Sequence, residues 1–216
     1  MPNGADARVP MVAPADRPVQ RDRWLAKWAA TRPGGVAPEH LAVFFASWHP
    51  PNLAAANIIL WLAPDLPEVQ FVLGGSHGDA FADDLVPANV VFTGRVGERV
   101  KRTLLGAADV ALKPMLQGSG TNLKVIEYLA AGVPVVSTRF GVRGLEVIDG
   151  THVLVAEPHE MVDAMRAVLA DPAAATTRAA AGRALALDRY DWTRLGEVLA
   201  EVVRGALTHR ADRVAG

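Results

Sequence analysis

The pattern that most restricts the fold of this chain is an alternation of short apolar runs with helical segments between residues 41 and 156. The apolar runs have the length of buried strands; LAVFFAS at 41–47 is a nearly continuous example. Strands that alternate with helices form a parallel sheet covered by helices on both faces. We therefore predict an α/β fold, a Rossmann-like doubly wound parallel sheet, with strands at 41–47, 69–75, 89–94, 108–114, 134–138 and 152–156.

The segments outside this alternation suggest the domain organisation. Residues 1–20 show neither a twofold nor a 3.6-residue period, so we expect a disordered arm there. Trp24 and Trp28 share one side of the short helix that follows, and we expect them to pack on the next domain, with a contact to a missing domain or partner as the alternative. We assign 1–38 to the arm, the short helix and a linker, and 39–210 to one domain that ends in three helices.

Composition excludes several classes of protein. The chain has 22 Lys and Arg against 23 Asp and Glu, and this balance gives no basic field of the kind that binds nucleic acids or anionic membranes. It has no cysteine, which excludes disulfides and cysteine-based zinc sites and agrees with a reducing cytosol. Its six histidines lack metal-binding spacings, so we expect no metal and no cofactor. Without a secretory signal or a long apolar stretch, we expect a cytoplasmic protein with no transmembrane segment.

The stretch GSGTNLKVIEYLAAGVP, residues 118–134, carries the main chemical signal. In a doubly wound sheet, ligands bind beyond the carboxyl ends of the strands, at loops that lead into helices. Gly118, Ser119 and Gly120 form such a loop, in which backbone amides can approach a ligand closely. We expect the following helix to begin near Thr121; its first amides have no partners within the helix, and together with the helix dipole they favour an anion such as a diphosphate.

Two charged side chains on this helix extend the hypothesis. Lys124 can add a positive charge to the anion site, and Glu127 can accept hydrogen bonds from ribose or sugar hydroxyls. The alternative is a solvated surface pair, with Leu123, Ile126 and Ala130 as the buried side of the helix. The spacing alone leaves both interpretations open.

Other ligand-binding signatures do not fit. A Walker loop is absent, and GSGTNL lacks the third glycine of a dinucleotide-binding fingerprint. GSHGD at 75–79 is more typical of a glycine turn after a strand than of a catalytic histidine site.

The run of residues 89–145 resembles the donor-binding half of GT-B glycosyltransferases of the group 1, family 4 type. GSGTNLKVIEYLAAGVPVV is the most specific part of the resemblance, which extends more loosely over residues 44–207. It implies a Rossmann-like domain that holds a nucleotide-diphosphate sugar for retaining transfer, without a metal ion.

The resemblance also implies roles for individual residues. The phosphates are expected at the amides after Gly118 and the ribose at Glu127, while Asn122 and Lys124 match positions beside the donor. We expect Glu127 and Lys124 to be the catalytic residues. The expected donor contacts are Gly118, Ser119, Gly120, Thr121, Asn122, Leu123, Lys124, Glu127, Arg95 and Val96.

Three features depart from the family pattern. Many members carry two glutamates eight residues apart, but Ser119 stands eight residues before Glu127. Many place an arginine and a lysine after the first strand to neutralise the departing diphosphate, where this chain reads SWHPPN at 47–52, and Gln117 replaces a common arginine. The sequence does not rank the available substitutes for these cations, which are Lys113, Lys124, Arg95 and Arg143.

Length is the largest departure, because a GT-B enzyme has two Rossmann-like halves with the reaction between them. We expect this chain to be a fragment, a subunit of a split enzyme, or a donor fold with another use. The first functional hypothesis is sugar transfer to a saccharide or lipid acceptor, with an acceptor-domain protein or a homodimer completing the cleft. The alternatives are a nucleotide-sugar binding or regulatory module without turnover, and a scaffold that docks a partner.

Overall fold

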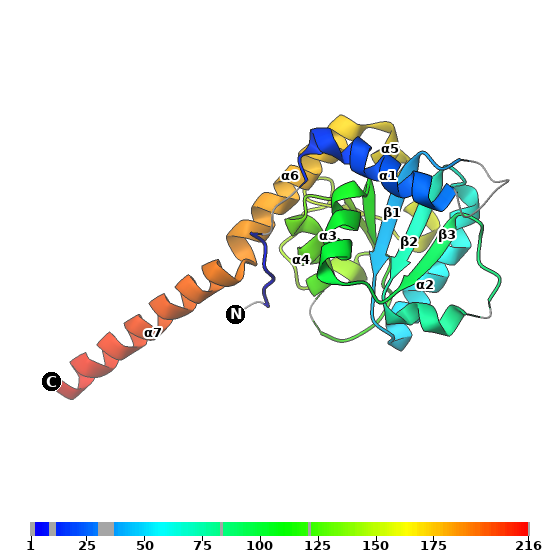
Figure 1. Cartoon of the computed structure of the whole chain (residues 1–216). Helices are drawn as coiled ribbons and strands as arrows, with labels where there is room; N and C mark the ends of the chain where they lie inside the picture. The colour runs from blue at the N-terminus through cyan, green and yellow to red at the C-terminus, as the bar shows by residue number, and fades with distance from the viewer. Residues whose placement is uncertain (1–2, 9–11, 30–36, 83, 121, 216) are drawn as a thin grey trace.

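Six parallel strands form one sheet in the computed structural model, which describes residues 3–8, 12–29, 37–82, 84–120 and 122–215, with only the backbone of 205 and 207–215. The strand order is β3-β2-β1-β4-β5-β6, which is the order of a dinucleotide-binding doubly wound sheet. Figure 1 shows β1, β2 and β3 side by side. The predicted fold class and all six predicted strands are confirmed. Their bounds are β1 His40–Phe45, β2 Val69–Gly74, β3 Val90–Gly94, β4 Val110–Lys113, β5 Val135–Ser137 and β6 Leu154–Val155.

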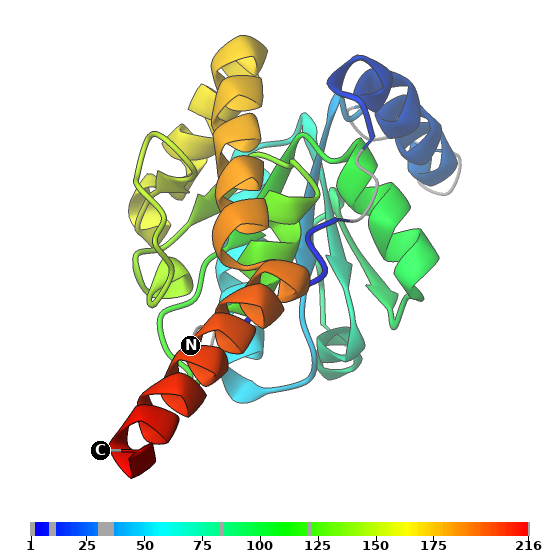
Figure 2. The same cartoon turned by 90° about the vertical axis from the view of Figure 1, so that its left-hand side faces the viewer.

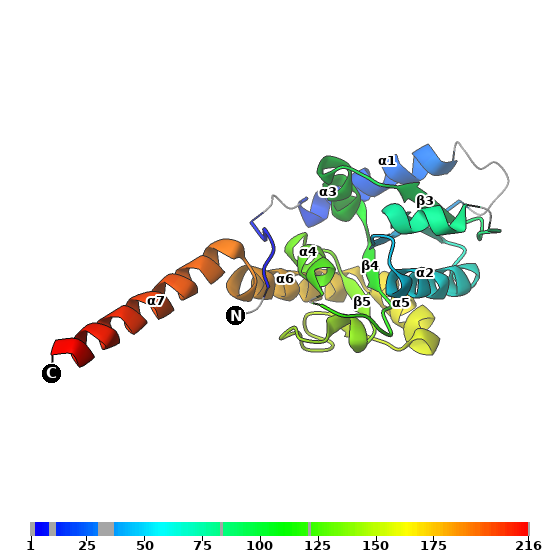
Figure 3. The same cartoon turned by 90° about the horizontal axis from the view of Figure 1, so that it is seen from below.

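Helices cover both faces of the sheet, with α2 and α5 on one side and α1, α3 and α4 on the other (Figure 3). The burial of successive side chains along β1 explains why both faces need cover: Phe44 packs in the cluster under α2 and α5, and Phe45 in the cluster under α3 and α4. The helices are α1 Arg17–Ala29, α2 Pro50–Leu62, α3 Glu98–Ala107, α4 Leu123–Ala130, α5 Met161–Ala170, α6 Pro172–Arg189 and α7 Trp192–Ala215.

The sheet opens between β1 and β4, its two central strands. Strand β1 pairs with β2 along its whole length, but with β4 only through Ala42 and Val43. Beyond these pairs, the buried hydroxyl of Tyr128 on α4 accepts a hydrogen bond of 2.8 Å from the backbone N–H of Phe45. A side chain thus replaces the missing strand partner at the point where the sheet splits. The chain leaves β1 toward one face and β4 toward the other, which makes this point the topological switch point of the fold.

Residues 3–8 of the N-terminal segment pair with distant residues, where a disordered arm was predicted for residues 1–20; residues 1–2 and 9–11 of that arm lie outside the described part of the chain. Ala5 exchanges backbone hydrogen bonds with Tyr190 and Trp192, and the Ala7 N–H donates to the Asp191 carboxylate at 3.2 Å. A short 3₁₀ turn at Pro14–Asp16 then leads into α1. These partners lie more than 180 residues away in the sequence, so no local period could reveal them.

Helix α1 packs on the domain as its tryptophans predicted. The rings of Trp24 and Trp28 stack with centroids 5.5 Å apart, and both are half-buried against the cluster under α3. At the other end of the chain, α7 extends away from the body of the molecule (Figure 1). Across the described residues, none of the helices has both the length and the apolar character needed to cross a membrane.

Helix α6 connects this outer helix to the sheet layers and lies across α4 (Figure 2). The contact is close at Gly182, where an added Cβ would lie 2.6 Å from a methyl carbon of Leu129. Because α6 presents mainly small residues, its backbone can approach α4 directly. The three predicted C-terminal helices are therefore confirmed, and the second one packs through alanine and glycine.

Candidate functional site

A cleft of about 350 Å³ lies at the switch point, beyond the carboxyl ends of β1 and β4. This is the position that the sheet topology predicts for a ligand. The loop after β1, predicted at 47–52, and the glycine loop after β4 meet here, and a third segment contributes Arg143. The residues that line the cleft are Phe45, Ala46, Ser47, Trp48, His49, Pro51, Asn52, Lys113, Met115, Gln117, Gly118, Ser119, Asn122, Lys124 and Arg143.

The glycine loop has the backbone conformation that its sequence suggests. Gly118 has a φ of 129° and Gly120 a φ of 88°, both in the left-handed region that favours glycine. The Arg143 guanidinium donates to the carbonyls of Gly118 and Gly120 at 2.9 and 3.1 Å. Arg143 therefore holds the loop in place, while Ser119 between the two glycines is exposed.

Helix α4 begins directly after this loop. Its first residue is Leu123, and the expected start near Thr121 falls on a residue outside the described part of the chain. The side chain of Asn122 does not cap the helix; it donates instead to the Arg143 carbonyl at 3.1 Å. Because no side chain caps the helix start, its first amides keep their capacity to bind an anion.

Lys124 and Glu127 form a pair, as their spacing predicted. Lys124 Nζ lies 3.0 Å from Glu127 Oε2, and Lys101 of α3 approaches the same oxygen at 3.2 Å. The Glu127 side chain is only 27% exposed, so the pair is not fully solvated. Lys124 lines the cleft, whereas Glu127 lines a neighbouring cavity between α3 and α4.

Lys101 joins the two helices through carboxylates on both. It contacts Glu98 at 2.9 Å within α3 in addition to Glu127 on α4. Burial of Lys101 acts to lower its pKa, but the hydrogen bonds and charges of the two glutamates outweigh burial, and the pKa is raised. Lys101 is therefore charged at neutral pH and holds Glu127 beside the cleft.

Lys113 is the cation that sequence reasoning named only as one of several substitutes. It is the last residue of β4 and is 6% exposed, yet its ammonium group has no hydrogen bond or ion pair with any described residue. Burial is the main cause that lowers the pKa of Lys113 to about 8, and the charges of Lys124 and Arg143 lower it further against the opposing effect of Glu127. The signal in the sequence was a lysine that ends an otherwise apolar strand.

Comparison with known proteins identifies the family of this chain. The model of the family described as "Glycosyl transferases group 1" matches residues 40–171. The chain belongs to the group 1 glycosyltransferases. It is 33% identical over 118 residues to glycogen synthase of Mycobacterium tuberculosis, covering 53% of this chain and 28% of that protein. It is 35% identical over 135 residues to a GDP-mannose-dependent alpha-(1-6)-phosphatidylinositol monomannoside mannosyltransferase of Mycolicibacterium smegmatis, covering 57% and 35%.

Solved glycosyltransferase structures share the fold. HepE of Anabaena in complex with UDP matches with a TM-score of 0.74 and 19% identity, over 94% of this chain and 56% of that one. Sucrose-phosphate synthase of Thermosynechococcus elongatus matches with a TM-score of 0.72 and 19% identity, over 96% and 52%. The chain thus spans about a third of the length of its curated relatives and about half of these structures.

Three of the four cations that the sequence offered for the diphosphate line the cleft. Lys113, Lys124 and Arg143 line it, while Arg95 is exposed after β3 and does not. Val96 is half-buried against the core, so the expected donor contacts of Arg95 and Val96 stay predictions.

Two further expectations concern side chains close to the cleft. Leu123 is 38% exposed and lines the cavity beside Glu127, so it does not belong to the buried side of α4, whereas Ile126 and Ala130 do. In the loop after β1, Pro50 and Pro51 occupy the first turn of α2, where they supply no N–H groups to a ligand.

The GSHGD stretch at 75–79 forms a structural turn. Gly75 has a φ of 126° and leads into a 3₁₀ turn at Ser76–Phe81, as expected for a glycine turn. His77 is buried in this turn, with Nδ1 2.9 Å from the Ala46 carbonyl, and burial lowers its pKa. Within the described ranges, His, Asp and Glu side chains form no group of three that could hold a metal ion.

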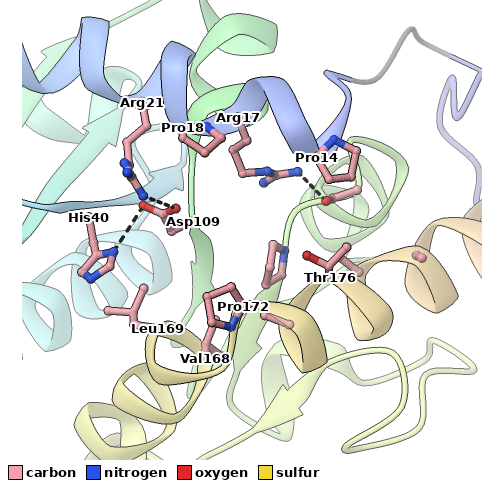
Figure 4. A pocket seen from close by; sticks show the side chains of 15 residues that line it. Pro14, Arg17, Pro18, Arg21, His40, Asp109, Val168, Leu169, Pro172 and Thr176 are labelled. Atoms are coloured by element: carbon pink, nitrogen blue, oxygen red, sulfur yellow. Dashed lines mark hydrogen bonds and ion pairs between the residues drawn. The ribbon is translucent and has the colours of Figure 1, made fainter.

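Another cavity, of about 250 Å³, lies near the amino ends of the strands, between α1 and the pair α5 and α6 (Figure 4). Its charged groups already have protein partners. Arg17 donates to the carbonyls of Ala108 and Gly132, and Arg21 pairs with Asp109 at 3.2 Å. These pairs anchor α1 to the rest of the domain, so the charged groups of this cavity have a structural role. The switch-point cleft is therefore the better candidate site.

Proposed function

We propose that this chain binds the nucleotide-diphosphate sugar donor in the switch-point cleft and supplies the donor-binding half of a retaining glycosyltransferase. The observation that carries the proposal is the convergence of Lys113, Lys124 and Arg143 on a glycine loop at the start of α4. A cluster of cations without nearby free carboxylates is unfavourable unless an anion occupies it. A diphosphate supplies the charge and the size that the cleft accepts.

The same groups explain how the chain would promote transfer. When the bond from the anomeric carbon to the diphosphate breaks, its electron pair moves to the diphosphate oxygen, which gains negative charge. The cations of the cleft and the first amides of α4 lie close to the position proposed for the diphosphate, so they would stabilise the charge as it develops. The acceptor hydroxyl forms the new bond to the anomeric carbon on the same face and releases its proton to the departing diphosphate.

Glu127 is proposed as the ribose contact. In the structure it is held between Lys101 and Lys124, at the side of the cleft. A carboxylate with two charged donors still has free lone pairs that can accept bonds from two vicinal hydroxyls. Binding would then turn Lys124 from Glu127 toward the phosphates, without breaking the contact from Lys101.

The names of similar proteins support the donor class and leave the base open. HepE structures contain UDP and UDP-glucose, and a mannosyltransferase relative is GDP-mannose-dependent. We therefore propose a uridine or guanosine diphosphate sugar, with a saccharide or lipid acceptor bound by a second half-fold. That half is either an acceptor-domain protein or a second copy of this chain. Because the chain spans about half of these structures, a binding module without turnover is the alternative.

Thermal unfolding with nucleotides tests the proposal. UDP, GDP or one of their sugar esters is expected to stabilise the folded chain by about 2.7 kcal/mol at a hundred times the dissociation constant. UMP and GMP should stabilise it much less, since they lack the second phosphate. Unchanged melting curves with all of these compounds at millimolar concentration would contradict the proposal.

Single substitutions place the donor in the cleft. Lys124→Ala and Glu127→Ala are each expected to weaken donor binding by about 1 to 3 kcal/mol, the cost of losing a hydrogen bond to a charged group. Lys27→Ala is the matched control, because Lys27 lies on α1 over the ring of Trp24 and outside the cleft. If both variants bind the donor with wild-type affinity, Lys124 and Glu127 form a purely structural pair and the proposed contacts are wrong.

A further inference from the structure

The backbone of Lys113 is held at the end of β4. Its main-chain carbonyl accepts hydrogen bonds from the Ser137 hydroxyl at 3.0 Å and from the Met115 N–H at the same distance. Gly141 packs directly on the aliphatic stem, since an added Cβ there would lie 3.1 Å from Lys113 Cγ. The stem is therefore held in a buried slot, and the ammonium group at its end reaches the cleft.

Lys113 also differs from the other two cleft cations in its partners. Lys124 is paired with Glu127, and Arg143 is bonded to the carbonyls of the glycine loop. Lys113 has no such partner among the described residues, although it is the most buried of the three. A mostly buried charge without a protein partner is unfavourable, and a ligand anion in the cleft would supply the missing partner.

We propose that Lys113 contacts the donor diphosphate directly and neutralises its charge as the sugar leaves, in place of the basic pair absent from the SWHPPN loop at 47–52. This assignment rests on the proposed function and names the residue on which leaving-group stabilisation depends. The loop after β1 is close enough to share the cleft, but its proline pair and exposed His49 supply no permanent cation.

A change of protonation on binding follows from this geometry. The charged groups around Lys113 are Lys124 and Glu127 from α4 and Arg143 from the segment after β5, and His49 lines the same cleft from the loop after β1. In the free chain, burial and the two neighbouring cations hold the pKa of Lys113 near 8. A bound diphosphate favours the charged form, so binding above pH 8 requires the uptake of a proton.

Isothermal titration calorimetry in two buffers of different ionisation enthalpy measures this proton directly. The probes are UDP-glucose and GDP-mannose, whose diphosphate esters do not titrate between pH 7 and pH 9. At pH 8.5, the wild type is expected to take up roughly 0.75 proton per bound ligand, which is the neutral fraction of a group with a pKa of about 8. Its affinity should fall about tenfold between pH 7 and pH 9.

Two variants separate a direct contact from a structural role. Lys113→Arg keeps its charge at all these pH values, so it should bind without proton uptake and with an affinity independent of pH. Lys113→Met fills the slot with an uncharged side chain of similar length; it should fold, lose at least tenfold in affinity at pH 7, and take up no proton. Lys124→Ala serves as the control: it should weaken binding and still take up protons, although fewer than the wild type at pH 8.5, because loss of the Lys124 charge raises the pKa of Lys113.

The outcomes distinguish this assignment from the function on which it rests. Binding by the wild type without proton uptake, or equal uptake in the wild type and Lys113→Met, would overturn the role of Lys113 and leave donor binding intact. If neither probe nor any nucleoside diphosphate binds the wild type, the proposed function itself fails and the assignment fails with it.

Discussion

Replacing Tyr128 with phenylalanine should destabilise the chain, because it removes the group that closes the sheet at the switch point. The Tyr128 hydroxyl is fully buried and accepts the N–H of Phe45 at 2.8 Å. Burial raises the pKa of Tyr128, so the hydroxyl is neutral over the whole accessible pH range. Without it, the Phe45 N–H stays buried with no acceptor, since β4 no longer pairs with β1 at this level. A buried unsatisfied donor costs about 1–3 kcal/mol.

Thermal unfolding followed by circular dichroism measures this loss. For a chain of this size, 1 kcal/mol corresponds to about 2–4 °C in Tm, so a decrease of about 2–12 °C is expected. Tyr190→Phe is the matched control: its hydroxyl accepts the N–H of Glu146 at 2.7 Å, but Glu146 is exposed and water can replace the lost acceptor. A Tm for Tyr128→Phe within 1 °C of the wild type, or a larger loss in Tyr190→Phe, would refute the reasoning.

Four further outcomes are expected. Because the folded-state pKa of Lys113 is depressed to about 8, the free energy of unfolding should rise with pH between about 8 and 10, by at most about 1.4 kcal/mol per pH unit, and Lys113→Met should lack this rise in denaturant titrations at each pH. Asp191→Ala should lower the free energy of unfolding by about 1–2 kcal/mol and increase proteolysis near Ala7, because the carboxylate accepts bonds from Ala7 and from the start of α7. Gly75→Ala should prevent stable folding or lower Tm strongly, since a Cβ there would lie 1.8 Å from the Ala46 carbonyl oxygen at a φ of 126°; a normal Tm would contradict this. Chelators should leave donor affinity unchanged in calorimetry, and a loss of binding in EDTA would show that a metal takes part.

The sheet was predictable because its strands are buried on both faces. Residues such as Leu41 and Phe44 belong to continuous apolar runs, in which the side chains on both faces of the strand are apolar. Such a run is typical of a strand that helices cover on both faces. The right-handed connections between parallel strands then decide which face of the sheet each connecting helix covers. The ends of the elements are set by tertiary contacts, and for this reason α4 begins at Leu123 and α1 already at Arg17.

The contacts of the N-terminal arm, and which of the candidate cations lines the cleft without a protein partner, were not predictable, because both depend on tertiary contacts. The order of residues 3–8 depends on Tyr190, Asp191 and Trp192, which no local pattern connects to them. The place of Lys113 depends on where β4 ends relative to Gly141, which packs on its stem. Glu127 was expected to face a ligand, and its pairing with Lys124 was equally compatible with the sequence; only the fold shows that Lys101 of α3 shares the carboxylate.

The isolated chain is expected to bind the donor without transferring sugar at an enzymatic rate. Orientation of donor and acceptor contributes about 7 to 11 kcal/mol to the rate of such reactions, and the proposed function assigns the acceptor to a second half-fold. A radiolabelled-sugar assay with saccharide and lipid acceptors, with and without candidate acceptor-domain proteins, measures this. Robust transfer by the chain alone would show that it supplies the second half-fold itself, for example as a homodimer.

The central claim is that the switch-point cleft holds a nucleoside diphosphate, and amide chemical shifts in ¹H–¹⁵N nuclear magnetic resonance test it most directly. On titration with UDP, GDP and their sugar esters, the largest shifts are predicted at the glycine loop and the first turn of α4, residues 118–124, and in the loop at 46–52. Amides of α1 that border the cavity between α1, α5 and α6 serve as an internal reference, and their signals should not shift. Shifts confined to the cavity between α1, α5 and α6, or no shifts with any of these ligands at millimolar concentration, would contradict the account.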